Sequence, residues 1–301
     1  MTALLALLAE LLHCALMLAA APTLLGLLRW TEARLARRRG PHPLQPWRDL
    51  ARLLRKHATL AENASPMFLA VPIASLAATA VTVLLVPSFT LGMAFGRFSD
   101  LLVLGGLLAL PRMLRSLAAL DAGTGSGGAT AARAMSLTVL AEPAMFLVIL
   151  TLGMLSGTTN LDLLISVQHG GMLQPGGASA LLAAALVAIG LGTSEPLDGL
   201  AEYGGVDLAA LTLAEGFRLL VWLDLIGAVF LPLGMSPAYA GPVGWSVGVL
   251  AWAVRVAVLT GMLSVFRHVG GHIRRVPLLL AAASLLGLLA TALAIASAAA
   301  I

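Results

Sequence analysis

Long apolar segments constrain the fold of this chain more than any other feature of its sequence. A helix needs about 20 apolar residues to cross the hydrocarbon core of a bilayer, and the segments lack the alternating pattern of a barrel strand. A composition of 59% hydrophobic and 11% charged residues excludes a soluble domain. The sequence therefore predicts an all-α polytopic membrane protein, with about eight transmembrane helices in a single integral membrane domain over residues 1–301. The predicted spans are about 3–28, 66–87, 100–118, 133–156, 179–194, 209–233, 243–266 and 276–299.

Basic residues are distributed unevenly between the loops that connect these spans. Of the 18 Lys and Arg residues, all except Arg97 and Arg255 lie in or beside the odd-numbered loops. Loops that carry such an excess of basic residues face the cytoplasm. We therefore expect both termini outside, with cytoplasmic loops at about 29–65, 112–132, 195–208 and 267–275.

The first cytoplasmic loop contains an amphipathic segment. Trp47, Leu50, Leu53 and Leu54 recur at helical spacing, with charged residues between them. This pattern predicts a helix that lies in the membrane interface. Two functions stay open for it, namely an anchor on anionic lipid and a docking surface for a soluble partner. The docking surface would contain Gln45, Pro46, Trp47, Asp49, Arg52, Arg55 and Lys56.

The third loop contains the glycine-rich run GTGSGG at residues 123–128. The run lacks the Lys-Ser/Thr of a P-loop, so it does not indicate a phosphate site. We expect a flexible connector at this position.

The fifth loop is acidic and carries no basic residue. Its carboxylates are either solvated or, if a partner covers them, repel one another and form a proton-accepting cluster. These residues are Glu195, Asp198, Glu202 and Asp207.

Glu142 stands near the middle of the fourth span, where a charged side chain costs roughly 2.5–3.5 kcal/mol. Pro143 follows it and disturbs the helix backbone. Arg133 lies nine residues earlier, on the opposite face of the same helix. Glu142 must therefore find a partner elsewhere or be protonated, and we interpret it as a candidate proton carrier.

Ionisable residues also stand inside the sixth and seventh spans. Glu215 and Arg218 share one helix face and can pair. Asp224 faces the opposite way, and Arg255 could pair with Asp224 or Glu142. Such residues are either structural ion pairs or parts of a hydrated polar path. The candidate path contains Glu142, Glu215, Asp224, Arg133, Arg218 and Arg255.

The first span carries Glu10 and His13 on one face. We expect His13 to be a satisfied helix-packing residue. No spacing of ligand-type residues suggests a metal site, and Cys14, the only cysteine, excludes an intrachain disulfide and a cysteine-held iron–sulfur cluster. We expect no cofactor in this chain.

Several motifs together resemble one family. After the first span stand GP at 40–41, LQP at 44–46, LLRK at 53–56 and ENAS at 62–65; Glu-Pro at 142–143, EYGG at 202–205 and RRVPLLLA at 274–281 follow. The chain resembles the subunit 1 family of respiratory complex I. Within that family it is most similar to the membrane subunits of group 4 nickel–iron hydrogenases, of the formate hydrogenlyase subunit 4 and hydrogenase-4 component C type.

The resemblance implies a non-catalytic, multi-pass subunit of the bacterial or archaeal cell (inner) membrane. Such a subunit joins a peripheral redox arm to antiporter-like membrane subunits. Glu142 and Glu215 would carry protons or sodium ions inside the membrane, the fifth loop would face the arm, and the first loop would dock it. Nickel–iron and iron–sulfur centres would lie in hydrogenase-like large and small partner subunits.

Three other functions remain open. The chain could line the quinone chamber of a complex I (NADH-quinone oxidoreductase), although its fifth loop is shorter than the family pattern. It could be an independent secondary transporter, although no inverted repeat is evident. It could also be a purely structural anchor.

Overall fold

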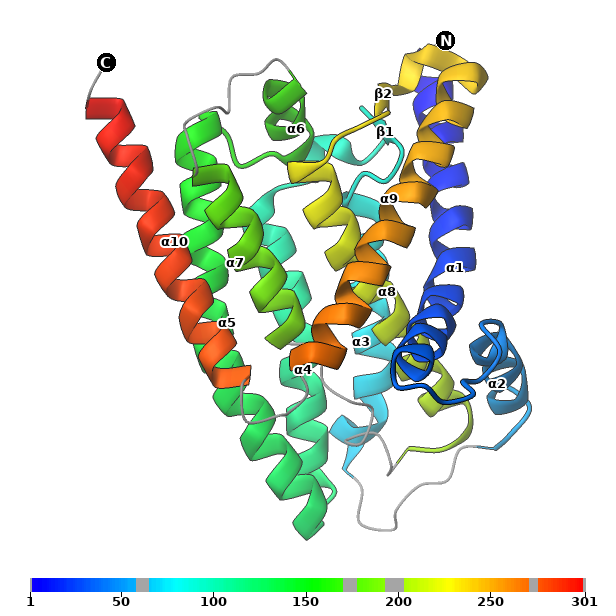
Figure 1. Cartoon of the computed structure of the whole chain (residues 1–301). Coiled ribbons are helices and arrows are strands. Elements are labelled where there is room, and N and C mark those ends of the chain that lie inside the picture. Colours follow the sequence, from blue (N-terminus) through cyan, green and yellow to red (C-terminus); the bar gives the residue numbers. More distant parts are fainter. Residues whose placement is uncertain (1, 58–64, 170–177, 193–202, 271–275, 300–301) are drawn as a thin grey trace.

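The computed structural model describes residues 2–57, 65–169, 178–192, 203–270 and 276–299. Long helices dominate this part of the chain and run side by side (Figure 1). The helices are α1 (Thr2–Leu35), α2 (Gln45–Leu53), α3 (Pro66–Leu85), α4 (Leu101–Asp121), α5 (Gly125–Ser156), α6 (Leu161–His169), α7 (Ala178–Gly192), α8 (Gly205–Phe230), α9 (Gly241–Gly270) and α10 (Val276–Ala299). Between them lie the 3-10 helices η1 (Gly96–Phe98) and η3 (Ala238–Ala240) and the strands β1 (Thr90–Leu91) and β2 (Ser236–Pro237).

Six of the described helices, α1, α3, α4, α5, α9 and α10, are long and apolar enough to cross a membrane. α7 is apolar but shorter, and α8 carries four ionisable residues within its 26 residues. The predicted all-α polytopic architecture is confirmed. By length and composition, however, the described chain gives six spans and a shorter apolar helix, not a clear eight, because α7 is short and α8 is charged.

Helix α8 lies at the centre of the bundle. It packs against α1, α3, α7 and α9, and most of its side chains are buried, including Glu215, Arg218 and Asp224. Because these neighbours shield it, α8 can hold ionisable residues that a lipid-facing helix could not. α10 lies at the edge of the bundle, against α5 and α7 (Figure 1).

Both termini lie at one end of the bundle (Figure 1). The same end holds α6 and the parallel pair of β1 and β2, in which Thr90 pairs with Ser236 and Leu91 with Pro237. Thr90 Oγ1–H also donates to the Ser236 carbonyl at 2.5 Å. These contacts join the segment after α3 to the segment after α8. α2 lies at the opposite end.

The amphipathic helix predicted in the first loop is confirmed as α2. Pro46 stands in its first turn, where a backbone N–H is not needed. Pro46 and Leu50 are buried, and Trp47 Nε1–H donates to Thr23 Oγ1 of α1 at 3.1 Å. α2 is therefore held against the lower part of α1.

The glycine-rich segment 123–128 is not the flexible connector that we expected. Thr124 caps α5, and its Oγ1 accepts a hydrogen bond from Gly127 N–H at 3.0 Å. Because α4 extends to Asp121, only residues 122–124 separate the two helices. Most of the predicted loop 112–132 is thus helical, since a hydroxyl cap satisfies an exposed N–H group and offsets the low helix propensity of glycine.

Candidate functional site

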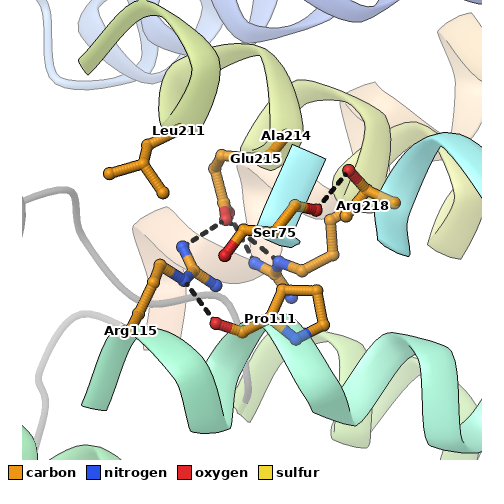
Figure 2. A pocket seen from close by; sticks show the side chains of 8 residues that line it. Ser75, Pro111, Arg115, Leu211, Ala214, Glu215 and Arg218 are labelled. Carbon is orange, nitrogen blue, oxygen red and sulfur yellow. Dashed lines mark hydrogen bonds and ion pairs between the residues drawn. The ribbon is translucent and has the colours of Figure 1, made fainter. Parts of the chain in front are cut away.

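Glu215 of α8 is the centre of a buried ionic cluster (Figure 2). Its Oε1 accepts a hydrogen bond from Arg218 Nη2 at 2.5 Å, and its Oε2 accepts from Arg218 Nε at 3.0 Å. Arg115 Nη1 of α4 donates to the same Oε2 at 3.0 Å. The two-point contact with Arg218 follows from the three-residue spacing on one helix face. The predicted pair of Glu215 and Arg218 is confirmed.

Arg115 reaches this cluster from within α4, which is helical through the region after residue 112 where we expected a cytoplasmic loop. Its Nε also donates to the Pro111 carbonyl, one turn earlier, at 3.2 Å. This contact holds the guanidinium group toward α8 (Figure 2). The sequence predicted a cytoplasmic loop at residues 112–132 that includes Arg115, so this contact with Glu215 was not expected. A continuous helical pattern through residue 121 was the available signal.

The space around the Glu215 cluster is dry. Glu215 is 7% exposed and Arg218 is 1% exposed. The gap between the surrounding side chains is too narrow for a water molecule. The carboxylate therefore balances guanidinium groups without solvent, as in a buried structural ion pair. The other residues that line the gap are Ser75, Thr79, Pro111, Leu211 and Ala214.

A second polar cluster surrounds Asp224, further along α8. Asp224 is completely buried, and its Oδ1 accepts a hydrogen bond from Trp252 Nε1 of α9 at 2.8 Å. Arg255 of α9 interacts electrostatically with Asp224. The ion pairs of the described chain do not include Arg255. The direct pair of Arg255 with Asp224 or Glu142 that the sequence suggested is therefore not formed.

Backbone carbonyls hold the Arg255 guanidinium group instead. Nη2 donates to the Ser88 carbonyl at 2.5 Å, and Nη1 donates to the Leu231 carbonyl at 3.3 Å. Gly227 of α8 leaves room for this side chain, because a Cβ atom there would lie 2.7 Å from Arg255 Cδ. Carbonyls just after α3 and α8 thus take the place of a carboxylate partner.

His13 of α1 contacts the same segment after α3. Its Nε2 lies 2.8 Å from the Val83 carbonyl and must donate to it. In the neutral ring, Nδ1 then accepts from Ser88 Oγ at 2.6 Å. Both ring nitrogens are occupied in a buried position, so the predicted role of His13 in helix packing is confirmed.

Glu142 and Arg133 lie apart from these clusters. Both stand on α5, which packs against α4, α7 and α10. Arg133 is exposed, and Glu142 is partly buried. Within the described residues, neither side chain has an ion pair or a hydrogen bond. The structure therefore brings together only part of the predicted path.

The acidic fifth loop is described only at its end. Asp207 stands in the first turn of α8, where a negative charge is favourable. Nearby, the rings of Tyr203 and Phe68 stack with centroids 4.1 Å apart, and the Tyr203 hydroxyl donates to the Phe68 carbonyl at 3.0 Å. These contacts fix the start of α8 against α3. The predicted residues that lie outside the described chain are Glu195, Asp198 and Glu202.

The predicted docking residues lie on α2 and just after it. Arg52 Nη2 donates to Asp49 Oδ1 at 3.0 Å. Arg52, Arg55 and Lys56 are exposed, whereas Pro46 is buried and adds nothing to an outer surface. This end of the molecule therefore presents a basic face.

Comparisons with known proteins agree with this architecture. A family model described as NADH dehydrogenase matches residues 8–298. The chain is 30% identical over 227 residues to hydrogenase-4 component C of Escherichia coli (strain K12), which is 71% of this chain and 72% of that protein. It is 27% identical over 246 residues to formate hydrogenlyase subunit 4 of the same organism, which is 76% of this chain and 79% of that protein.

The fold is also similar to that of a chain in a solved structure of the membrane-bound sulfane sulfur reductase, an archaeal respiratory membrane complex. The TM-score is 0.68 at 17% sequence identity, over 93% of this chain and 98% of that chain. The family match extends over nearly the whole chain and confirms the resemblance found in the sequence motifs. The chain therefore belongs to the NADH dehydrogenase family, as a membrane subunit of the complex I subunit 1 type.

Proposed function

We propose that this chain is a non-catalytic membrane subunit of a hydrogenase-type, complex I-related oxidoreductase complex. It anchors a peripheral redox arm and contributes an acidic intramembrane path, through which electron transfer drives proton or sodium translocation. The similarity to hydrogenase-4 component C and formate hydrogenlyase subunit 4 supports this class of complex. One observation carries the path: the central helix α8 holds two buried carboxylates, Glu215 and Asp224, at different depths.

The spacing of these carboxylates suits stepwise ion transfer. Nine residues of helix rise about 13.5 Å, so Glu215 and Asp224 serve separate levels of the bundle. A proton that binds Glu215 would remove the negative charge of the carboxylate with which both Arg115 and Arg218 pair. A guanidinium group that is released in this way can turn aside and admit water to the dry gap beside Glu215. Arg255 would balance the charge on Asp224 at the second level.

Glu142 and Arg133 have a lateral role in this proposal. The partly buried Glu142 has no partner among the described residues, and an intramembrane carboxylate needs one or must be protonated. A neighbouring antiporter-like membrane subunit beside α5 would supply a polar partner. Glu142 then passes the ion sideways, out of this chain.

The proposed arrangement in the membrane has eight spans, in which α7 and α8 also cross. Support comes from the shielding of α8 by its neighbours and from both termini lying at one end of the bundle (Figure 1). The termini then face outward from the bacterial or archaeal inner membrane. The basic face of α2, with the fifth loop, meets the peripheral arm on the cytoplasmic side.

Partner subunits would hold the redox centres. We propose a hydrogenase-like large subunit with nickel and iron, and a small subunit with iron–sulfur clusters. Among the described residues, no group of three or more His, Cys, Asp or Glu side chains is arranged to hold a metal ion.

Affinity purification of the tagged chain from mild detergent, with mass spectrometry of the recovered proteins, tests the class of complex. We expect a hydrogenase-like large subunit, an iron–sulfur subunit and an antiporter-like subunit. Recovery of a lone, stable chain that catalyses ion flux in liposomes would contradict the proposal and favour a secondary transporter. Recovery with bound quinone and a quinone reductase activity would identify a quinone-chamber subunit instead.

Substitution of Glu215 in the assembled complex tests the path. We expect Glu215→Gln to lower the number of ions translocated per electron pair in inverted vesicles while electron transfer continues. The double variant Glu215→Gln/Arg115→Gln restores the local charge balance and separates structural loss from loss of the acid. Asp121→Asn is the control, because an asparagine oxygen can still accept the Ser65 N–H that Asp121 binds. Full coupling in the double variant would show that the Glu215 cluster has a structural role and no role in ion translocation.

A further inference from the structure

Two carboxylates accept hydrogen bonds from the same short backbone segment, residues 92–95, at the end of the bundle that carries both termini. Asp162, at the start of α6, accepts a hydrogen bond at Oδ2 from Gly92 N–H at 2.9 Å. Glu10 of α1 accepts at Oε2 from Phe95 N–H at 3.4 Å. A Cβ atom on Gly96 would clash with Asp162 Oδ2, so a glycine lets that carboxylate rest against the backbone. Because Glu10 and Asp162 also interact electrostatically, we name them the outer acid pair.

One oxygen of each carboxylate in the outer acid pair lacks a hydrogen-bond donor. Glu10 is only 3% exposed. Its Oε1 and the Oδ1 of Asp162 are both buried, and neither has a hydrogen-bond partner in the part of the chain that the structure describes. A buried carboxylate keeps its charge only if donors or cations compensate it. The backbone N–H groups of Gly92, Phe95 and Ala94 leave these two oxygens without a donor, so a pair with a single negative charge fits this environment better.

A cavity of about 510 Å³ adjoins the outer acid pair. This volume is enough for several water molecules, since each occupies about 30 Å³ in the liquid. Asp162 lines the cavity, and so does Ala6, one turn before Glu10 on α1. Water in the cavity can therefore reach the pair at Asp162. Other residues in the lining are Leu91, Gly92, Met235 and Pro237.

Other titratable groups on the surrounding elements do not bond to the outer acid pair within the described chain. The Arg97 guanidinium group lies over the adjacent phenyl ring, 5.5 Å from its centroid. Asp100 caps α4, and His13 is occupied by Ser88 and Val83. Tyr239 of η3 lines the same cavity and is 72% exposed, and Cys14 is a free thiol on α1. The pair has no basic partner among these groups.

We propose that the outer acid pair binds one proton and exchanges it with water in the adjoining cavity. The proton forms an O–H bond on one carboxylate, which changes the charge of the pair from −2 to −1. The protonated carboxyl then donates a hydrogen bond to the other carboxylate, directly or through one water molecule. Glu10 Oε1 and Asp162 Oδ1, which otherwise lack a hydrogen-bond partner, both gain one in this way.

The surroundings of Asp162 agree with this assignment. Burial raises the pKa of Asp162, and the N–H group of Gly92 opposes this effect only in part. Glu10 lies one helical turn from His13, which is joined through Ser88 to Arg255. The outer acid pair is thus next to the chain of polar groups that ends near Asp224. Its place as the outer end of an ion path rests on the function proposed above, whereas the bound proton does not.

Infrared difference spectroscopy of the purified complex during a change of pH tests the bound proton. In the wild-type protein we expect one carbonyl band of a protonated carboxyl, which shifts in D₂O and disappears at high pH. Glu10→Gln and Asp162→Asn should each remove this same band, because both residues share one proton. Both replacements keep an oxygen that can accept the backbone N–H group, and Glu10→Asp should retain the band at a shifted frequency. Asp207→Asn, at the other end of the bundle, should leave it unchanged.

Three results would overturn the proposal that the outer acid pair shares one proton. The first is a wild-type spectrum without an exchangeable carboxyl band. The second is loss of the band in only one of the two amide variants, which would assign the proton to a single residue. The third is loss of the band on addition of Na⁺ at constant pH, which would indicate a bound sodium ion. None of these measurements depends on whether the complex couples electron transfer to translocation.

Discussion

Arg115 Nη1 lies 3.0 Å from Glu215 Oε2, although 100 residues separate the two side chains in the sequence. The contact joins α4 to the central helix α8 in a space that excludes water. It makes the Glu215 cluster both a candidate part of the ion path and a structural tie. The two roles predict different effects of substitution.

Arg115→Met should destabilise the protein strongly. Removal of one partner from a buried ionic group costs about 3–5 kcal/mol, although Arg218 still binds Glu215 and reduces the loss. Thermal unfolding of the detergent-solubilised complex would measure it. Arg52→Met is the matched control, because Arg52 pairs with Asp49 at an exposed position, where ion pairs contribute about 0–1 kcal/mol. Equal unfolding temperatures for the two variants would show that the Arg115 contact adds no stability.

Gly227→Ala should displace the Arg255 side chain. The added Cβ atom would lie 2.7 Å from Arg255 Cδ, and overpacking of this kind costs about 1–3 kcal/mol. Gly261→Ala in α9 is the control, since no atom lies within 4 Å of the added carbon. We expect the control to be neutral or slightly stabilising, because alanine favours helix over glycine by about 1 kcal/mol. A ranking in the opposite direction would mean that Arg255 does not need the space beside Gly227.

Trp252→Phe should destabilise the second cluster. The substitution keeps an aromatic ring but removes the Nε1–H that Asp224 accepts, and an unsatisfied buried group costs about 1–3 kcal/mol. A second substitution, Asp224→Leu, removes the acceptor as well. We expect it to recover part of the loss in unfolding temperature. Independent, additive losses would argue against the hydrogen bond.

Asp162 should make stability depend on pH. Burial raises the pKa of Asp162 above its ordinary value of 3.8, so the folded state binds the proton more tightly than the unfolded state. The stabilisation is therefore present at pH values below 3.8 and is lost as the pH rises through the raised value in the folded protein. Asp162→Asn should remove this loss and flatten the unfolding temperature between these limits. Parallel curves for wild-type and variant protein would contradict the prediction.

Cysteine labelling should test which end of the bundle faces outward. In a Cys14→Ala background, a membrane-impermeant maleimide should label Ser166→Cys in intact spheroplasts. It should label Arg52→Cys only after the membrane is opened. Ser166 and Arg52 are both exposed side chains, on α6 and α2 respectively. Labelling of Arg52→Cys in intact spheroplasts would reverse the proposed topology.

The sequence predicted what depends on local spacing and missed what depends on contacts between distant segments. The pair of Glu215 and Arg218 was predictable, because three residues of helix place two side chains on one face. Arg115 was not, because its partner is 100 residues away and the basic residues around it indicated a loop where the structure has helix α4. The glycine content of residues 123–128 was also misleading, because one threonine cap starts a helix there in spite of the glycines.

The buried charges show the same limit. The sequence showed that buried charges exist. It could not show that backbone carbonyls are the partners of Arg255, because every residue has a backbone carbonyl. The outer acid pair was also beyond reach, because Glu10 and Asp162 meet only through the turn that Gly92 and Gly96 allow.

The narrow gap beside Glu215 has a consequence for a cell at rest. A continuous file of water through a membrane protein would let ions leak across the membrane. In this conformation the gap beside Glu215 admits no water, so on the path proposed above charge could cross the Glu215 cluster only after a side chain moves. On the path proposed above, ion leakage between turnovers would depend on how often Arg115 or Arg218 releases the Glu215 carboxylate.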